Sequence, residues 1–320
     1  MPHILLIGAG FSHNWDGLLA SELDGALYGQ LANDAGLNRL LRESGSFEEA
    51  LGRVQAEFRA QPTPATRLAL DGMQGAILAV FNRMNLAFAA IPSMEFGPPP
   101  HFVASSVLRF LARFDAIFSL NQDLLLELHY NIELHNHRQW QGHQFPGMQP
   151  PPNWRGQITR DQLDTIWMPS AALNVEPRLQ PIFKLHGSVN WRDAQDGALL
   201  VMGTNKEATI ASKAILEWYH QQFLDYLNRP DTRLMIIGYG FSDTHINEAI
   251  VQASLTSGLR MYVVHPAGLQ AWNRHPPGTI RPIYSLDGVG ILGFSTRPIS
   301  RTFANDPVSL QELNGFFVNA

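Results

Sequence analysis

Short apolar runs, each ending at glycine or at polar residues, divide this chain. They span residues 4–7, 116–120, 182–185 and 234–237, and a fifth run rich in β-forming residues spans 261–264. Runs of this length with β-branched side chains are typical of strands that are buried on both faces of a parallel sheet. We therefore predict a buried parallel strand at each of these positions.

Helical patterns occur between the predicted strands. Apolar residues at 47, 50, 51 and 54 follow the i, i+3, i+4, i+7 spacing of one helix face. Residues 18–31, 68–89 and 103–114 are also expected to be helical. Strands that alternate with helices predict an α/β fold with a Rossmann-like doubly wound parallel sheet.

Most of the helical pattern falls in one long excursion between the first two predicted strands. We therefore expect a Rossmann-like core made of residues 1–16 and 101–320, with residues 17–100 forming an inserted helical module. Clusters of proline and glycine at 97–100 and 146–152 interrupt the chain. A chain of 320 residues has room for such a division.

Composition excludes several classes of site. The chain has no cysteine, so it has no disulfide, no thiolate nucleophile and no cysteine-bound zinc. Its 28 acidic and 23 basic residues give a net charge of −5, which does not favour a nucleic-acid or membrane surface. The first apolar run ends at Gly8, and no later run approaches the roughly 18 to 20 apolar residues of a membrane span. We expect a soluble, cytoplasmic protein.

The first candidate motif is Gly8-Ala9-Gly10-Phe11-Ser12, directly after a predicted strand. Glycines at such a turn let backbone N–H groups approach a phosphate, and a helix that follows presents its positive end. His13 stands where the dinucleotide-binding fingerprint has its third glycine. The motif alone therefore also fits a plain turn from strand to helix.

The second and third motifs follow the next strands. Asn121 and Asp123 point the same way if their segment is extended, although Asp123 also suits the cap of a helix that begins at Leu124. His186 ends an apolar strand and is followed by glycine, which is a suitable place for a general base. The alternative for His186 is a core histidine bonded to a backbone carbonyl.

The fourth motif begins at Gly238 and continues through Gly240, Ser242 and Asp243 into a predicted helix. It suits a phosphate or ribose contact, or a capped turn with Ser242 or Asp243 as the N-cap and no ligand. All four motifs follow strands of one parallel sheet. Ligands of such sheets bind outside the carboxyl ends of the strands, so we expect the motifs to meet there.

The ordered segments GAGFS, SLNQD, KLHGS and GYGFSD resemble the sirtuin superfamily, and more closely its bacterial antiphage-defence branch of NAD-hydrolysing domains. The resemblance implies that His186 is the catalytic base and that Asn121 holds the ribose hydroxyls or the attacking water. It also implies that the remaining motif residues contact NAD+. These are Gly8, Ala9, Gly10, Phe11, Ser12, Asp123, Gly238, Gly240, Ser242 and Asp243.

Three departures separate the chain from protein-deacylating sirtuins. Residues 13–16 are His-Asn-Trp-Asp where those enzymes have an Ile-Pro-Asp-Phe-Arg type of segment, and Leu120 replaces a glutamine. The four-cysteine zinc module is also missing. The resemblance therefore implies NAD+ as substrate, no zinc, and cleavage to nicotinamide and ADP-ribose rather than deacylation.

Other functions remain as alternatives. They are a regulatory module that binds NAD or ADP-ribose without turnover, a protein deacylase, and a dehydrogenase. The dehydrogenase needs an acidic residue after the second strand, but Glu22 and Asp24 lie within a predicted helix. His135 and His137, near His129, suit a metal, yet we expect solvated side chains and no metal site. The resemblance further implies NAD+ depletion in antiphage defence, restrained by a homo-oligomer or by a partner such as a HerA-type ATPase or an Argonaute-like protein.

Overall fold

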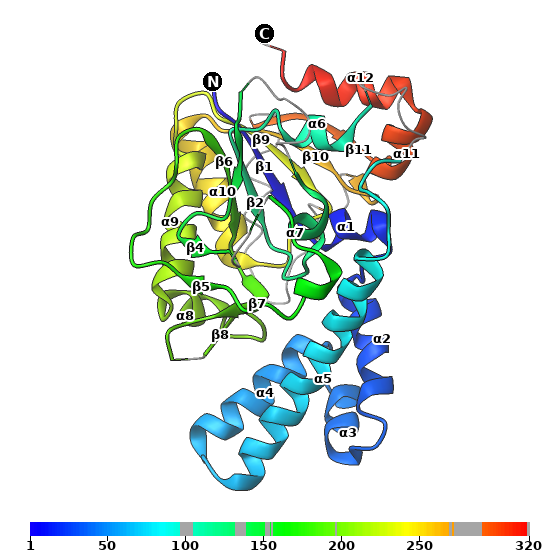
Figure 1. Cartoon of the computed structure of the whole chain (residues 1–320), viewed down its shortest axis with the longest axis vertical. Helices are drawn as coiled ribbons and strands as arrows, with labels where there is room; N and C mark the ends of the chain where they lie inside the picture. The colour runs from blue at the N-terminus through cyan, green and yellow to red at the C-terminus, as the bar shows by residue number, and fades with distance from the viewer. Residues whose placement is uncertain are drawn as a thin grey trace.

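A parallel sheet forms the centre of the protein, as a computed structural model shows (Figure 1). The structure describes residues 1–96, 105–131, 139–150, 154, 156–195, 197–268, 271 and 290–318. The sheet has seven strands in the order β11-β10-β9-β1-β2-β6-β3. These strands are β1 (His3–Ile7), β2 (Ala116–Ser119), β3 (Gly142–Gln144), β6 (Leu179–Lys184), β9 (Arg233–Ile237), β10 (Arg260–Val264) and β11 (Ile291–Ser295).

The α/β fold predicted from the sequence is confirmed. All five predicted strands are present, with ends that differ by no more than three residues. The central strands β1, β2 and β9 are almost wholly buried, as their uninterrupted apolar runs require. The two edge strands, β3 and β11, were not predicted. Two small antiparallel pairs accompany the main sheet: β4 (Met148–Gln149) with β5 (Met168–Pro169), and β7 (Gly187–Arg192) with β8 (Ala198–Leu200).

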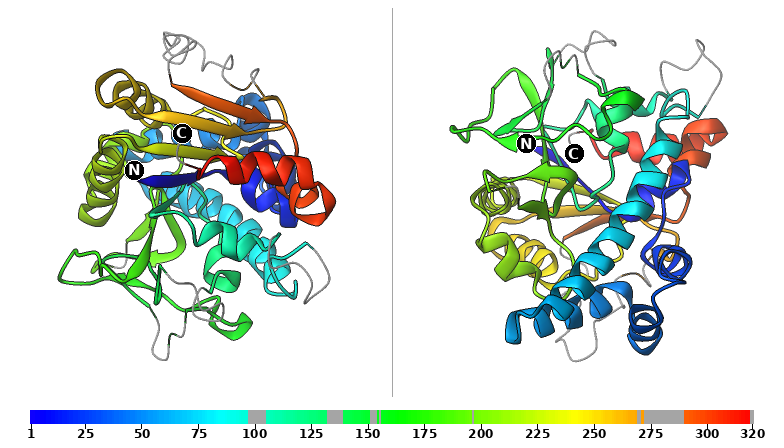
Figure 2. Two further views of the ribbon diagram at one scale, coloured as in Figure 1. Left: turned by 90° about the horizontal axis from the view of Figure 1, so that it is seen from above. Right: turned by 60° about the horizontal axis from the view of Figure 1, so that its bottom comes forward.

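Helices cover both faces of the sheet (Figure 2). Those between β1 and β2 are α1 (Ala9–Ser12), α2 (Ala20–Gln30), α3 (Ala35–Glu43), α4 (Phe47–Ala60), α5 (Pro64–Phe88) and α6 (Val107–Leu111). The later ones are α7 (Leu125–His129), α8 (Lys206–Ala211), α9 (Ala214–Leu227), α10 (Thr244–Ser257), α11 (Ile299–Asn305) and α12 (Pro307–Gly315). The predicted helix over 103–114 is shorter than expected, and residues 103 and 104 lie outside the described part of the chain.

Helices α2 to α5 extend away from the end of the sheet at which β1 leads into α1 (Figure 1). Three of these helices begin at side-chain caps: Asp34, Ser46 and Thr63 accept hydrogen bonds from the first turns of α3, α4 and α5. The division of the chain into a core and an inserted module at residues 17–100 stays a prediction. The proline cluster at its end, 97–100, is outside the described residues.

The order of the strands places a topological switch between β1 and β9. The chain leaves β1 towards β2 on one side and later returns to β9 on the other. Ile7 pairs with Ile237, and Ser119 pairs with Lys184. Continuing these registers puts Gly8 level with Gly238 at one edge of the sheet. This edge is where doubly wound folds bind ligands.

Among the residues that the structure describes, no helix combines the length and the apolar character needed to cross a membrane.

Candidate functional site

The glycine motifs after β1 and β9 pack directly on each other. Gly238 has a φ of 67°, and a Cβ atom there would lie 2.3 Å from the carbonyl carbon of Gly10. A Cβ on Gly8 would lie 2.8 Å from the Gly238 carbonyl oxygen. Only glycine allows this approach of two backbones together with a left-handed φ. Packing between the loops therefore accounts for these three glycines before any ligand is considered.

The N–H groups of the first loop are largely used within the protein. Gly8 donates to the Ile237 carbonyl at 3.0 Å, and Gly10 donates to the Gly238 carbonyl at 2.9 Å. Phe11 donates to the Gly8 carbonyl at 2.8 Å, and its ring is buried against Trp15. The helix that follows has four residues, so its dipole is small. Ala9 is the exposed residue of this loop. Phosphate binding by the loop stays a prediction.

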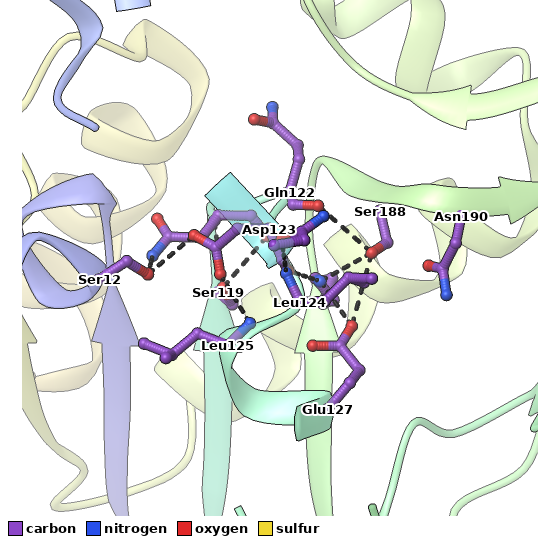
Figure 3. A network of polar contacts seen from close by, with 12 residues as sticks. Ser12, Ser119, Gln122, Asp123, Leu124, Leu125, Glu127, Ser188 and Asn190 are labelled. Carbon is purple, nitrogen blue, oxygen red and sulfur yellow. Dashed lines mark hydrogen bonds and ion pairs between the residues drawn. The ribbon is translucent and has the colours of Figure 1, made fainter. Parts of the chain in front are cut away.

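Ser12 joins the first motif to the second (Figure 3). Its hydroxyl donates to Asp123 Oδ2 at 2.8 Å and accepts from Asn121 Nδ2 at 2.9 Å. The same amide nitrogen donates to the Gly8 carbonyl at 3.1 Å, which fixes the orientation of the Asn121 amide. Both predicted residues of the second motif thus reach the glycine loop, as the shared direction of their side chains predicts.

Asp123 also bonds the start of α7, where its Oδ1 accepts from the Leu125 N–H at 3.0 Å. The N-cap position itself belongs to Leu124, so Asp123 caps the helix from one residue earlier. Burial raises the pKa of Asp123, while the charge of Lys184 and the two hydrogen bonds work against that rise. Asp123 is therefore held by the protein on both carboxyl oxygens.

A buried ion pair lies beneath the second motif (Figure 3). The Lys184 ammonium donates to Glu127 Oε1 at 2.6 Å, to Ser188 Oγ at 2.8 Å and to the Asp123 carbonyl at 2.5 Å. Lys184 and Glu127 are both almost completely inaccessible to solvent. The lysine comes from β6 and the glutamate from α7, so the pair fixes the segment after β2 to the neighbouring strand.

Asn121 comes two residues after Ser119, and His186 comes two residues after Lys184, the partner of Ser119 in the adjacent strand, so both follow the carboxyl ends of neighbouring strands. Burial lowers the pKa of His186 to about 3, so its imidazole is neutral near pH 7. Its Nε2 atom lies 3.4 Å from Nε2 of His245. Among the contacts of the described residues, the His186 side chain makes no hydrogen bond to a backbone carbonyl, which was the alternative considered for it.

The fourth motif reaches the same edge in a strained loop. Phe241 has a φ of 55°, which is unfavourable for a bulky residue, and Ser242 beside it is exposed. Asp243 is the N-cap residue of α10, but its side chain makes no cap hydrogen bond. Its Oδ1 instead lies 2.7 Å from the ammonium of Lys206, which also pairs with Glu48 of α4 at 2.7 Å. The expected cap is therefore replaced by an ion pair. No described contact joins Gly240 to the other motifs.

Four residues of the site were assigned no role in the sequence analysis. They are Lys184, Glu127, Lys206 and His245. The sequence held one sign of the buried ion pair. Lys184 is a charged residue inside the apolar strand 182–185, and a buried lysine requires a partner. No group of three or more residues suited to a metal occurs in the described part of the chain. His129 binds the Phe88 carbonyl, while His135 and His137 are outside the described residues.

One comparison with known proteins found a match. A family model described as "SIR2-like domain" matches residues 115–276, which include the second, third and fourth motifs. No curated protein matches the chain.

Proposed function

The chain belongs to the SIR2-like domain family, whose members are commonly NAD-utilising enzymes, and we propose that it hydrolyses NAD+ to nicotinamide and ADP-ribose. One observation carries this proposal. Asn121 and His186 follow the carboxyl ends of the adjacent strands β2 and β6, and hydrogen bonds hold Asn121 to the glycine loop. A fixed amide and a neutral imidazole at the same edge of the sheet suit the attack of water on a sugar carbon.

The reaction breaks the bond between nicotinamide and the ribose carbon, which becomes oxocarbenium-like. Both N–H bonds of the Asn121 amide are used by Gly8 and Ser12, so its carbonyl oxygen is the atom offered to a ribose hydroxyl or to water. His186 accepts a proton from that water or hydroxyl as the new bond to oxygen forms. Asp123, held by Ser12, orients the carboxamide of nicotinamide.

The burial of these side chains supports a regulated enzyme. Ser12 and His186 are each 2% exposed, and Asn121 is 8% exposed. We infer that the site opens to admit NAD+ when the enzyme is activated. In keeping with the resemblance to defence proteins, we propose an effector that depletes NAD+ during antiphage defence and is switched on by assembly. The assembly is a homo-oligomer or a complex with a HerA-type ATPase or an Argonaute-like protein.

The test is the release of nicotinamide and ADP-ribose from NAD+ by the purified chain and two variants. His186→Ala and Asn121→Ala should each keep the fold and lose about 10²-fold or more of the rate, since a general base is worth about 10² to 10⁴. Two controls remove the same residue types elsewhere. His3→Ala lies at the opposite end of β1, and Asn228→Ala changes an exposed residue after α9.

The outcomes separate the candidate functions. Wild-type turnover in either site variant would contradict the assignment of that residue. Binding of NAD+ without cleavage, even with candidate partners, would support a regulatory module. Nicotinamide release that needs an acyl-lysine peptide would support deacylation.

A further inference from the structure

A row of histidines leads from the proposed base towards solvent. His186 is buried, and its Nε2 faces Nε2 of His245 at 3.4 Å, so one ring donates to the other. His245 is partly exposed at the start of α10. Its ring centroid lies 5.6 Å from that of His220 on α9, which is also partly exposed.

The row ends in an open groove of about 530 Å³ between α9 and α10. His220 and Leu224 of α9 line one side, and His245, Glu248 and Gln252 of α10 line the other. His245 therefore has the buried base on one side and a space large enough for water and small buffer molecules on the other. None of the four sequence motifs gave His245 or His220 a role.

Hydrolysis of NAD+ creates a need for such a path. Water adds to the ribose carbon of a cationic dinucleotide, and neutral nicotinamide leaves together with one proton. Nicotinamide is too weak a base to carry that proton away near neutral pH. The proton must therefore leave the base in every turnover, and His186 is itself only 2% exposed.

We propose that His245 relays the proton from His186 to solvent through the groove between α9 and α10. The inference rests on the proposed NAD+ hydrolysis. The ring nitrogen of His186 that does not face His245 takes the substrate proton, and its Nε2 passes a proton to Nε2 of His245. The other nitrogen of His245 then releases a proton to water in the groove. Each ring is then neutral but in its opposite tautomer, and a flip of each imidazole restores the starting positions of the hydrogens before the next turnover.

The charges around His245 suit a carrier that stays uncharged between turnovers. Asp243 and Glu207 attract a proton on His245, whereas His220 and Lys206 repel it. Burial has the largest effect and lowers the pKa of His245 below its ordinary value. The low pKa of His186, about 3, makes transfer towards the more exposed ring favourable.

The experiment measures nicotinamide release at low buffer concentration by the full chain and its His245→Ala and His245→Gln variants. We expect both to lose at least about tenfold in rate while NAD+ binding is kept. Imidazole added to His245→Ala should restore the rate in a saturable way, because the open groove admits it. Gln252→Ala in the same groove is the control, and should keep the wild-type rate and gain nothing from imidazole.

Each result decides between the two proposals. Active wild type with fully active His245 variants would overturn the relay and leave NAD+ hydrolysis in place. A loss that imidazole does not restore would assign His245 a purely structural role, and would also overturn the relay. If His245→Ala unfolds, the rate of folded His245→Gln decides, because glutamine preserves side-chain size but cannot carry a proton: a wild-type rate overturns the relay, and a loss of at least about tenfold supports it. No hydrolysis by the wild type under any condition would remove both proposals.

Discussion

Replacement of Lys184 by methionine tests whether the buried ion pair holds the site together. The variant keeps most of the apolar length of the side chain but removes a cation that donates to Glu127, Ser188 and Asp123. Glu127 is completely buried, so its carboxylate would be left without the partner that offsets its loss of hydration. Removing one member of such a pair costs about 3 to 5 kcal/mol. At about 2 °C per kcal/mol for a long chain, the melting temperature should fall by roughly 6 to 10 °C.

The pH dependence of this loss follows from Glu127. Burial already raises the pKa of Glu127 above its ordinary value of 4.5, and the charge of Lys184 opposes the rise. Without Lys184 the pKa rises further, so the folded state favours the protonated acid more strongly. A group with a raised pKa favours folding at low pH and loses that contribution as pH rises through the folded value. The difference between wild type and Lys184→Met should therefore shrink from pH 8 towards pH 5.

A double-mutant cycle gives the decisive measurement. Lys184→Met, Glu127→Gln and their combination are compared by thermal and urea unfolding. The double variant leaves no unpaired buried charge. Its loss in free energy of unfolding should therefore be smaller, by about 2 kcal/mol or more, than the sum of the losses in the two single variants. Arg53→Met, which removes an exposed helix pair with Glu49, should leave the melting temperature unchanged. Strictly additive losses from Lys184 and Glu127 would refute the coupling.

Two further predictions concern stability. Gly238→Ala should destabilise the fold by about 2 to 5 kcal/mol, for two reasons. Alanine is strained at the left-handed φ of this position, and its Cβ would clash with the backbones of Gly10 and Phe11. Gly240→Ala has open space and is its control, and equal melting temperatures for the two variants would contradict this account. Burial lowers the pKa of His143 to about 3, so its contribution to stability is lost as pH falls below 6.5, by about 1.4 kcal/mol per pH unit. His143→Phe should flatten unfolding free energy against pH in that range, and an unchanged slope would show that His143 is already protonated in the fold.

Continuous burial explains which strands were predictable. The five strands found from the sequence lie inside the sheet or carry uninterrupted apolar runs. The two that were missed are its edges, β3 and β11. β3 is Gly-His-Gln, and β11 is only partly buried along most of its length. An edge strand needs apolar residues on fewer sides, so hydrophobic runs alone do not mark it.

The partners of buried charges were not predictable for a different reason. Lys184 and Glu127 are 57 residues apart in the chain. Lys206 forms ion pairs with Glu48 and Asp243, and these three residues come from three separate elements. No local pattern encodes such pairs, because they depend on how β6 meets α7 and on how α8 meets α4 and α10. The sequence shows only that a charge in an apolar strand needs a partner. Which residue is that partner becomes known only from the fold.

The glycines after β1 show how one pattern serves two purposes. Gly8 and Gly10 match the start of a nucleotide-binding fingerprint, yet each lies against the backbone of Gly238, and their N–H groups bond to carbonyls of the protein. A loop built only for close packing would need the same residues. Asn121 and His186 are different, because packing alone would be satisfied by apolar side chains at both positions. Their polar groups, which follow the carboxyl ends of the adjacent strands β2 and β6, therefore indicate the chemistry more specifically than the glycines do.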